Sequence, residues 1–396
     1  MRSVYVIGVG MTPFSSPRVS PSYLSLGATA IQGALSDSGI GFDSVEQVFA
    51  GYVYGDSCSG HRVVHEVGLS GIPIFNVNSN CSSGSSALYL ACQSIRGGEN
   101  DCVLAVGFEQ MPSGAVSEHW QDRPTPLEVF ERIASSYLTP EQANVPVAPK
   151  LFAAAAREYQ EKYGLDLDSL AAVSVKNRRH AADNPLAFLR DPVSCLDVLS
   201  SPSVCDPLTR LQCCPPTCGS AAVVLCSESF LKRHSTASPV RIAAIALVTD
   251  RSETFSGSAM EAVGSGLARI AGEAAFREAA VSRSTIQVAE VHDCFTINEI
   301  LACEALGLFD VGDAEAYIES GANSYGGTCV VNSSGGLLSK GHPLGATGLA
   351  QCFEITKQLR GTAEPSRQVN EARWGLAHNI GVGSTCVVTL FEGNGA

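Results

Sequence analysis

Short apolar runs alternate with helix-like patterns along residues 1–111. Strands are predicted where Val, Ile and Ala follow one another with little polar interruption, as expected for strands that are buried on both faces. These runs cover residues 4–9, 45–53, 74–77 and 101–106. Apolar residues at helical spacing separate them, over 24–34 and again after Cys81, where Gly97 and Gly98 end the pattern. The alternation predicts an α/β fold with a largely parallel sheet covered by helices.

The pattern changes between residues 112 and 206. Charged residues and prolines increase there, and strand alternation stops, so this stretch is predicted to be an inserted, mostly helical excursion. Strand-like runs then return, at 217–225, 240–248, 286–291, 377–383 and 386–391. The last two are expected to be adjacent strands joined by a glycine-rich turn.

A local pattern occurs twice in the chain. Val77-Asn78-Ser79 leads to Cys81 and a helix, and Val331-Asn332-Ser333 leads to a glycine-rich loop and a helix over 344–359. The distance between the two copies is too long for a solenoid. The repeat instead predicts that a whole half of the protein was duplicated, with each half built around one such helix.

Composition limits the class of protein. The chain has 396 residues, 45% of them hydrophobic, which is enough for two packed domains or one large double one. The 26 basic and 39 acidic residues give a net charge of −13, which argues against a general nucleic-acid or membrane-surface binder. No apolar run is long enough to span a bilayer.

The 15 cysteines are scattered and indicate a reducing compartment rather than a disulfide framework. The N-terminus enters a strand without a leader pattern, and the last four residues, 393–396, are not a peroxisomal signal. A cytoplasmic or mitochondrial location is therefore expected.

Cys81 lies where a predicted strand passes into a predicted helix. Free N–H groups and partial positive charge at the start of a helix favour a thiolate over a thiol. Small residues follow Cys81, at positions 82–86, and would leave room for a bulky acyl group. A buried structural cysteine is the alternative, but this position favours a nucleophile.

Three further loops follow predicted strands and carry polar residues. They contain His292 with Cys294, His342, and the segment 379–381. Open α/β sheets bind ligands beyond the carboxyl ends of their strands, so these loops are expected to meet near Cys81. His342 is the candidate base for the cysteine. Taken alone, His342 would be an ordinary loop residue and Cys294 a structural one.

Two other clusters were considered as binding sites. The only dense basic group of the excursion consists of Lys176, Arg178, Arg179 and His180. It is either a solvated helix face or a seat for cofactor phosphates, and in the second case Lys176, Arg178 and Arg179 would bind the cofactor. The run Cys213-Cys214-Pro215-Pro216-Thr217-Cys218 has the wrong spacing for paired zinc knuckles. No metal site is expected, and Asp101 and Glu109 are assigned no role.

Three motifs together resemble the thiolase superfamily. They are Asn80-Cys81-Ser82-Ser83-Gly84, His292-Asp293-Cys294-Phe295 and Gly341-His342-Pro343-Leu344-Gly345-Ala346-Thr347-Gly348. The second motif is similar to that of the branch containing the thiolase domain of sterol carrier protein X and its stand-alone relatives. Ordinary thiolases have Asn-Glu-Ala at that point. The resemblance extends over essentially the whole chain.

The resemblance implies a thiolase fold, with two similar halves in a five-layer α-β-α-β-α arrangement and an inserted loop domain. The N-terminal half would comprise 1–111 and 207–250, the loop domain 112–206, and the C-terminal half 251–396. It also implies coenzyme A thioesters as substrates, coenzyme A as a substrate rather than a bound prosthetic group, and a homodimer.

The resemblance also implies roles for individual residues. Cys81 would be the acylated nucleophile and His342 its base. His342 and His292 would donate to a thioester oxygen, and Cys294 would move the proton at the α-carbon. The N–H groups of Cys81 and Gly381 would hold the oxygen of the acyl-enzyme.

One departure from ordinary thiolases affects the acid/base assignment. Those enzymes have Cys-x-Gly near the C-terminus, where this chain has Asn379-Ile380-Gly381. Cys386 lies within the last predicted strand and is not assigned that role. Cys294 is the candidate offered instead.

Thiolysis of 3-oxoacyl-CoA, as in fatty-acid β-oxidation, is therefore the expected activity. Condensation, hydrolysis or retro-aldol cleavage in lipid metabolism are alternatives, although retro-aldol chemistry would not need Cys81. A third alternative is a protein that binds CoA or acyl-CoA without turnover.

Overall fold

The computed structural model describes residues 2–112, 122–142, 144–234, 238–383 and 385–393. A ten-stranded sheet runs through this part of the chain in the order β10-β9-β11-β12-β8-β1-β7-β4-β2-β3. Its strands are β1 (Val4–Met11), β2 (Gln47–Gly51), β3 (Ile74–Val77), β4 (Cys102–Glu109), β7 (Gly219–Ser227), β8 (Val240–Thr249), β9 (Val288–Glu290), β10 (Val330–Val331), β11 (Trp374–Gly381) and β12 (Thr385–Glu392).

The sheet consists of two halves with the same connectivity. In the order β1-β7-β4-β2-β3, the first two pairings are antiparallel and the next two parallel. The order β8-β12-β11-β9-β10 repeats those directions. Strands β1 and β8 join the halves by an antiparallel pairing that includes Val4 and Ile242. The predicted duplication is confirmed.

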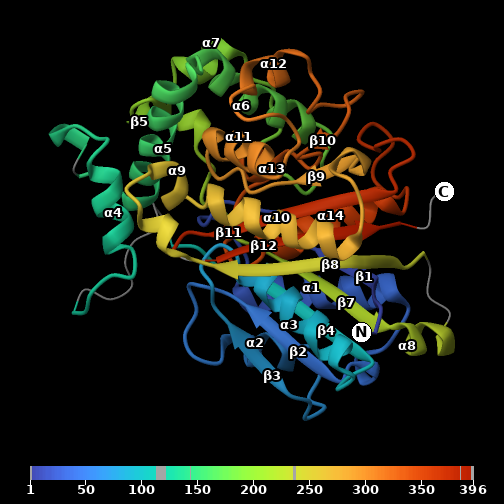
Figure 1. Ribbon diagram of the computed structural model, residues 1–396. Coiled ribbons are helices and arrows are strands. Elements are labelled where there is room, and N and C mark those ends of the chain that lie inside the picture. Colours follow the sequence, from blue (N-terminus) through green and yellow to red (C-terminus); the bar gives the residue numbers. More distant parts are fainter. Residues whose placement is uncertain (1, 113–121, 143, 235–237, 384, 394–396) are drawn as a thin grey trace.

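Helices separate and cover the two halves (Figure 1). The helices α3 (Ser83–Gly97) and α14 (Thr347–Leu359) contact each other and strands of both halves, so they form the middle layer. On the outer faces, α1 (Tyr23–Ser38) packs on β1 and β7, and α10 (Ser265–Ala279) packs on β8 and β12. The expected five-layer arrangement is confirmed.

The expectation of a largely parallel sheet is wrong. Strand β7 runs antiparallel to both β1 and β4, and β12 runs antiparallel to β11 and β8. Every residue of β4 and β7 is buried. A central antiparallel strand that is buried on both faces has the same continuous apolar run as a parallel one, so apolarity does not report strand direction. The expected hairpin at the C-terminus is present as β11–β12.

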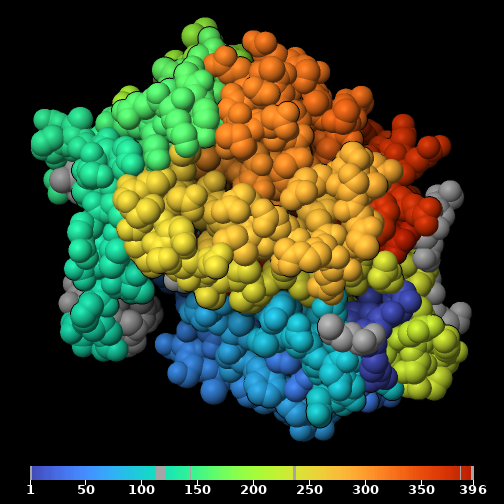
Figure 2. Space-filling view, in the orientation of Figure 1, coloured from blue at the N-terminus to red at the C-terminus, as the bar shows by residue number. Residues whose placement is uncertain are grey.

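Four helices of the described part of 112–206 lie beside the C-terminal half. They are α4 (Glu128–Ser135), α5 (Val147–Tyr163), α6 (Leu167–Ala181) and α7 (Cys195–Leu199), followed by the β-hairpin β5 (Ser203–Cys205) and β6 (Leu208–Thr209). Helix α6 contacts α11 (Thr296–Ala305), α12 (Ala314–Glu319) and α13 (Gly336–Ser339), and Figure 2 shows this green region against the orange one. The four-part division of the chain stays a prediction.

The remaining α-helices of the described residues have 4 to 10 residues each. They are α2 (Ser59–His65), α8 (Glu228–Arg233), α9 (Ala259–Ala262), α11 (Thr296–Ala305), α12 (Ala314–Glu319) and α13 (Gly336–Ser339). Within the described ranges, no helix has the length and apolar character needed to cross a membrane.

Candidate active site

Cys81 lies in a tight turn between β3 and α3. The Ser83 hydroxyl accepts from the Ser79 N–H at 2.9 Å and donates to the Asn80 carbonyl at 2.6 Å. Asn80 has φ +52°, a left-handed conformation that Asn tolerates better than most residues. Its side chain donates to the Val382 carbonyl at 2.8 Å. These bonds hold the turn against the end of β11 and fix Cys81 immediately before α3.

Three predicted site residues from distant parts of the chain lie together. One ligand atom each of Cys81, His292 and His342 falls within 4.8 Å of the other two. The two imidazole rings meet edge to face, with centroids 5.0 Å apart. His292 follows β9, and His342 lies in the loop between α13 and α14. The carboxyl ends of strands from both halves thus converge on one point.

The hydrogen bonds of His342 determine which ring nitrogen can act as a base. Its Nδ1 lies 2.7 Å from the Thr347 hydroxyl, which itself donates to the Pro343 carbonyl at 2.9 Å. Nδ1 must therefore carry the proton and donate to Thr347, and Nε2 keeps a free lone pair. Nε2 has no hydrogen-bond partner. Burial, with a further contribution from His292, lowers the pKa of His342 well below its usual value, so the ring is neutral near pH 7.

His292 has a similar arrangement on the other side of the cluster. Its Nδ1 lies 2.8 Å from Oδ1 of Asn379, whose amide nitrogen donates to the Ser85 hydroxyl at 3.1 Å. Nε2 of His292 is buried without a partner. Burial lowers the pKa of His292 to about 4, and the bond to Asn379 opposes this only in part. The sequence predicts a loop at 379–381 but indicates no role for Asn379.

The expectation that helix geometry favours a Cys81 thiolate is not supported. Desolvation of the sulfur, and then the negative charge of Glu109, raise the pKa of Cys81 to about 12. The residue as a whole keeps some exposed surface. The N–H groups of Cys81 and Val382 oppose this shift but are weaker. The resting side chain is therefore a thiol, and a neutral base beside it is needed to make the nucleophile.

Cys294 is buried beside this cluster. Burial raises its pKa well above that of a free thiol, and Cys214 and Cys81 add to the shift. The Cys294 carbonyl accepts the N–H of Cys214 at 2.9 Å, which fixes the backbone of the loop. At neutral pH Cys294 is a thiol, and so it can act as a proton donor. Its neighbour Cys214 was considered only as part of a rejected zinc motif.

Two glycines allow the loops to approach this closely. A Cβ on Gly381 would lie 2.1 Å from the Ser79 carbonyl, so the end of β11 packs directly on the turn before Cys81. A Cβ on Gly345 would lie 2.5 Å from the Phe108 carbonyl and 2.6 Å from that of Gly51. Any side chain at either position would push the site apart.

Glu109 connects three loops at the site, although the sequence assigned it no role. Its carboxylate accepts N–H groups from Val53, Tyr54 and Gly345 at 2.8–3.1 Å. Burial raises its pKa to about 7, while these three bonds act in the opposite direction. The carboxylate thus holds the loop of His342 against the ends of β2 and β4.

Asp293 ties the loop of His292 and Cys294 to the inserted helix α6. It accepts N–H groups from Leu337 at 2.6 Å and Leu338 at 3.3 Å, and the Asn177 amide donates to it at 2.7 Å. Burial, and then the charge of Glu299, raise the pKa of Asp293 well above its usual value. Asp293 was quoted in the sequence motif, but nothing in the pattern indicated this supporting role.

The three predicted phosphate-binding residues do not face one surface. Lys176 is buried, pairs with Glu299 at 2.5 Å and donates to the Val331 carbonyl at 3.1 Å. Arg178 is also buried and donates to the Asp191 carbonyl at 3.1 Å. Only Arg179 is exposed. A phosphate seat at Lys176 or Arg178 would require these internal contacts to break.

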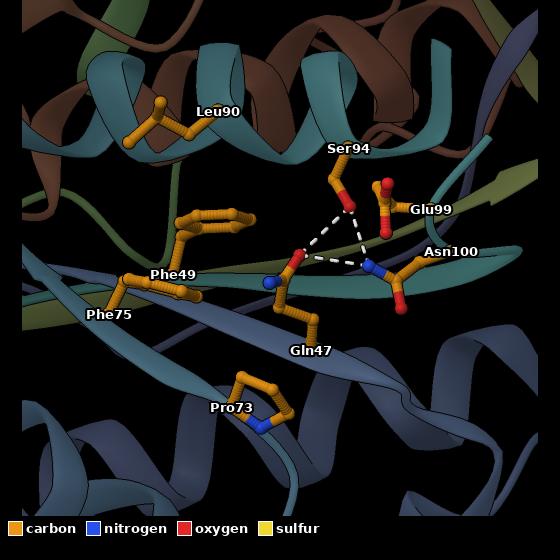
Figure 3. Close-up of a pocket in the computed structure, with 8 residues that line it drawn as sticks. All are labelled: Gln47, Phe49, Pro73, Phe75, Leu90, Ser94, Glu99 and Asn100. Carbon is orange, nitrogen blue, oxygen red and sulfur yellow. Dashed lines mark hydrogen bonds between the residues drawn. The ribbon is translucent and has the colours of Figure 1, made fainter. Parts of the chain in front are cut away.

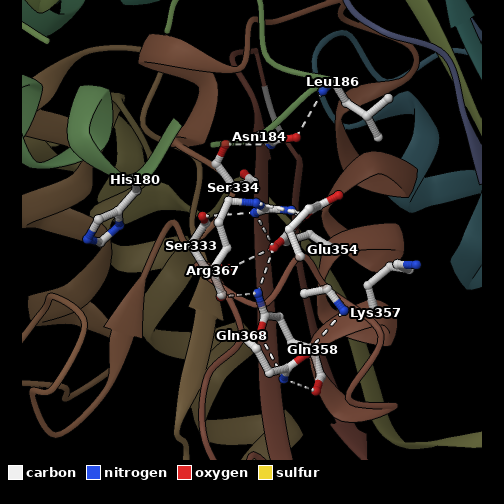
Figure 4. Close-up of polar contacts among 12 residues, drawn as sticks. His180, Asn184, Leu186, Ser333, Ser334, Glu354, Lys357, Gln358, Arg367 and Gln368 are labelled. Atoms are coloured by element: carbon white, nitrogen blue, oxygen red, sulfur yellow. Dashed lines mark hydrogen bonds and ion pairs between the residues drawn. The ribbon is translucent and has the colours of Figure 1, made fainter. Parts of the chain in front are cut away.

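A second buried network supports the segment that precedes His342 (Figure 4). The Glu354 carboxylate pairs with Arg367 at 2.9 Å, and it accepts from the Ser333 hydroxyl at 3.1 Å. Arg367 also donates to the Ser333 carbonyl at 3.2 Å. The network links helix α14 to the end of β10.

Comparison with known proteins agrees with this geometry. Residues 4–229 match the family model of the thiolase N-terminal domain, and residues 249–392 match that of the thiolase C-terminal domain-like family. Sterol carrier protein 2 of Bos taurus is 46% identical over 395 residues, covering 98% of this chain and 72% of that protein. Acetyl-CoA acetyltransferase of Methanothermobacter thermautotrophicus is 35% identical over 407 residues, covering 99% of this chain and 100% of that protein. The solved structure of an Ltp2-ChsH2(DUF35) aldolase matches with a TM-score of 0.83 at 22% identity over 99% of this chain and 98% of its own.

Proposed function

The chain belongs to the thiolase family, and from this premise we propose that it cleaves 3-oxoacyl-CoA with CoA, giving acyl-CoA and acetyl-CoA. The observation that carries the proposal is the convergence of Cys81, His292 and His342, with a free Nε2 on each ring. The 35% identity to an acetyl-CoA acetyltransferase over the full length supports an acyl transfer between CoA thioesters.

Acylation would begin with a proton transfer from the Cys81 thiol to Nε2 of His342. The sulfur then attacks the 3-oxo carbon, and the bond between C2 and C3 breaks. Its electron pair passes to an acetyl-CoA enolate, which the Cys294 thiol protonates at C2. In the second stage the Cys294 thiolate takes the proton of the CoA thiol, and the CoA sulfur attacks the acyl group on Cys81. The released Cys81 sulfur takes back its proton from Nε2 of His342, so all three groups return to their starting states.

Donors to the enolate oxygen determine much of the rate in such a reaction. Once His342 has accepted the Cys81 proton, its Nε2–H can donate. His292 keeps its proton on Nδ1 while Asn379 presents Oδ1 to it. A half turn of that amide, with the Ser85 hydroxyl donating instead of accepting, would move the proton of His292 to Nε2. Loss of one such donor costs about 3 kcal/mol of barrier.

The remaining site proposals concern the oxygen of the acyl-enzyme and CoA itself. We propose that the N–H groups of Cys81 and Gly381 hold that oxygen, which is supported by the close packing of Gly381 on Ser79. Arg179 is retained as a candidate contact for CoA phosphates because it is exposed. Coenzyme A is a substrate in this scheme, and the compartment stays a prediction.

The direct test is product analysis. Purified protein is incubated with CoA and 3-oxoacyl-CoA esters of increasing chain length, beginning with acetoacetyl-CoA, and the thioesters are separated by chromatography. We expect acetyl-CoA and the shortened acyl-CoA to form together. Cys81→Ser should abolish this, whereas Cys58→Ser, at an exposed cysteine outside the site, should not.

Other outcomes would identify the alternatives. Free acid in place of acyl-CoA would mean hydrolysis, and faster condensation of acetyl-CoA than cleavage of acetoacetyl-CoA would mean synthesis. Cleavage of a 3-hydroxy thioester that survives in Cys81→Ser would mean a retro-aldol enzyme. CoA binding without any product would mean a binding protein.

We further propose a homodimer formed through the edge strand β3. Strand β3 ends the sheet, and Phe75 on it is 48% exposed. A hollow of about 360 Å³ lies beside Phe75, bordered by Leu90 of α3 and by the linked polar side chains of Gln47 and Ser94 (Figure 3). Light scattering should give the mass of two chains, and Phe75→Lys should give that of one. An unchanged mass in Phe75→Lys would place the contact elsewhere.

A further inference from the structure

We propose that Cys81, His292 and His342 form a binding site for Zn²⁺, which would occupy the place of the acyl substrate and block the thiol. The site follows from the geometry of three side chains, so it does not depend on which CoA thioester the protein uses. No metal site was expected from the sequence, because the three ligands come from separate loops and have no common spacing.

The ligand set and its dimensions suit zinc. Cysteine thiolate and histidine imidazole are both common zinc ligands, and three protein ligands with a fourth position left open are typical of zinc enzymes. Zn–S and Zn–N bonds of about 2.3 and 2.0–2.1 Å place tetrahedral ligand atoms about 3.3–3.6 Å apart. The three atoms here lie within 4.8 Å of one another, so small side-chain rotations bring them to a common ion. Among the residues that the structure describes, no other Cys, His and carboxylate side chains form such a group.

Two buried nitrogens without partners provide independent support. His292 is 0% exposed and His342 is 5% exposed, and neither Nε2 has a hydrogen-bond partner. Each Nδ1 is already bonded, to Asn379 and to Thr347. Bonding of this kind at the second nitrogen fixes the tautomer and the ring orientation of zinc-binding histidines in other proteins. The Nε2 lone pairs of His292 and His342 are thus both free to bind a metal ion.

The exchange balances in protons and charge. Zn²⁺ replaces the proton of the Cys81 thiol, a Zn–S bond forms, and one proton is released to solvent. Two neutral imidazoles add no charge, so the bound centre carries one net positive charge. The Glu109 carboxylate, close enough to act electrostatically on Cys81, partly balances that charge.

Titration of the reduced full-length protein with Zn²⁺ against a chromophoric chelator tests the site. We expect one tight equivalent, one sulfur and two histidine nitrogens in the X-ray absorption spectrum of the zinc, and protection of Cys81 from alkylation. Cys81→Ser should weaken binding at least ~100-fold. Thr347→Val, which removes the hydroxyl that bonds to His342 Nδ1 and to the Pro343 carbonyl, should weaken it ~10–100-fold.

Surface binding must be separated from this site. Cys58 is exposed and one helical turn from His61, so the variant Cys58→Ser/His61→Asn is the matched control and should keep the tight equivalent. The proposal is overturned if the wild-type protein has no tight equivalent, or if that equivalent survives in Cys81→Ser and Thr347→Val. It is also overturned if the control loses the equivalent. Because every readout is binding or spectroscopy, an inactive protein still gives a result.

Discussion

Replacing Lys176 by Met distinguishes a buried structural ion pair from a phosphate contact. The Lys176 ammonium lies 2.5 Å from the Glu299 carboxylate, and the two side chains are only 6% and 2% exposed. At an effective dielectric constant of about 20, their attraction is about 7 kcal/mol. Desolvation of both ions, at several kcal/mol each, offsets most of it. The pair itself therefore contributes little net stability.

Removing one partner has a much larger effect than the net value of the pair. Lys176→Met leaves the Glu299 charge buried, and such a loss costs about 3–5 kcal/mol. Glu299 keeps amide donors from Asn177 at 2.8 Å and Asn332 at 2.7 Å, so we expect the lower end, about 3 kcal/mol. Lys176→Met/Glu299→Gln removes both charges and should recover at least half of the loss.

Urea unfolding followed by circular dichroism measures this change, with Arg179→Met as the exposed control. We expect Lys176→Met to lower the unfolding free energy and Arg179→Met to leave it within ~0.5 kcal/mol. The opposite pattern would refute the reasoning. In that case Lys176→Met would unfold like the wild type, while its KM for CoA would rise at constant kcat.

Three further predictions concern the base, the loop packing and pH. His342→Gln should lower the rate of acyl transfer by a factor of ~10²–10⁴ in stopped-flow assays, and a wild-type rate would exclude His342 as the base. Gly345→Ala should lower the thermal stability and the activity, because the added Cβ would clash with backbone atoms. Gly97→Ala should lower neither, because an added Cβ there has no atom within 4 Å. Equal behaviour of the two variants would contradict the close packing around Gly345. Burial lowers the pKa of His180 to about 3. Below pH 6.5 the unfolded chain therefore binds a proton at this residue that the folded chain does not bind. His180 alone should lower the free energy of unfolding by up to about 5 kcal/mol as pH drops from 6.5 to 3. His180→Gln should remove that part of the pH dependence in pH-resolved unfolding.

Local patterns in the sequence predicted much of the fold. The repeat of Val-Asn-Ser before a central helix indicated the two halves, and the apolar runs located most strands. Strand direction was missed because β4 and β7 are buried on both faces, which gives the same apolar run in either direction. Pairing depends on contacts between segments far apart in the chain, and periodicity within one segment does not contain that information.

The site was predictable where a residue type is needed for the chemistry and was missed where a residue only supports it. Cys81, His292 and His342 lie in loops with recognisable motifs, and in the structure one ligand atom of each lies within 4.8 Å of the other two. Asp293 lies in the motif of His292 and Asn379 in the loop 379–381, but their hydrogen bonds reach across the fold. For Lys176 the sequence left open a solvated helix face and a phosphate seat, and it did not indicate the buried pair with Glu299, because a buried ion pair and a solvated basic cluster look alike in sequence.

Mass spectrometry of the protein after brief incubation with acetoacetyl-CoA tests the central claim most directly. We expect an acetyl adduct on the peptide that contains Cys81, and its loss when free CoA is added. Consumption of acetoacetyl-CoA without any adduct on Cys81, or with an adduct on another cysteine, would contradict it.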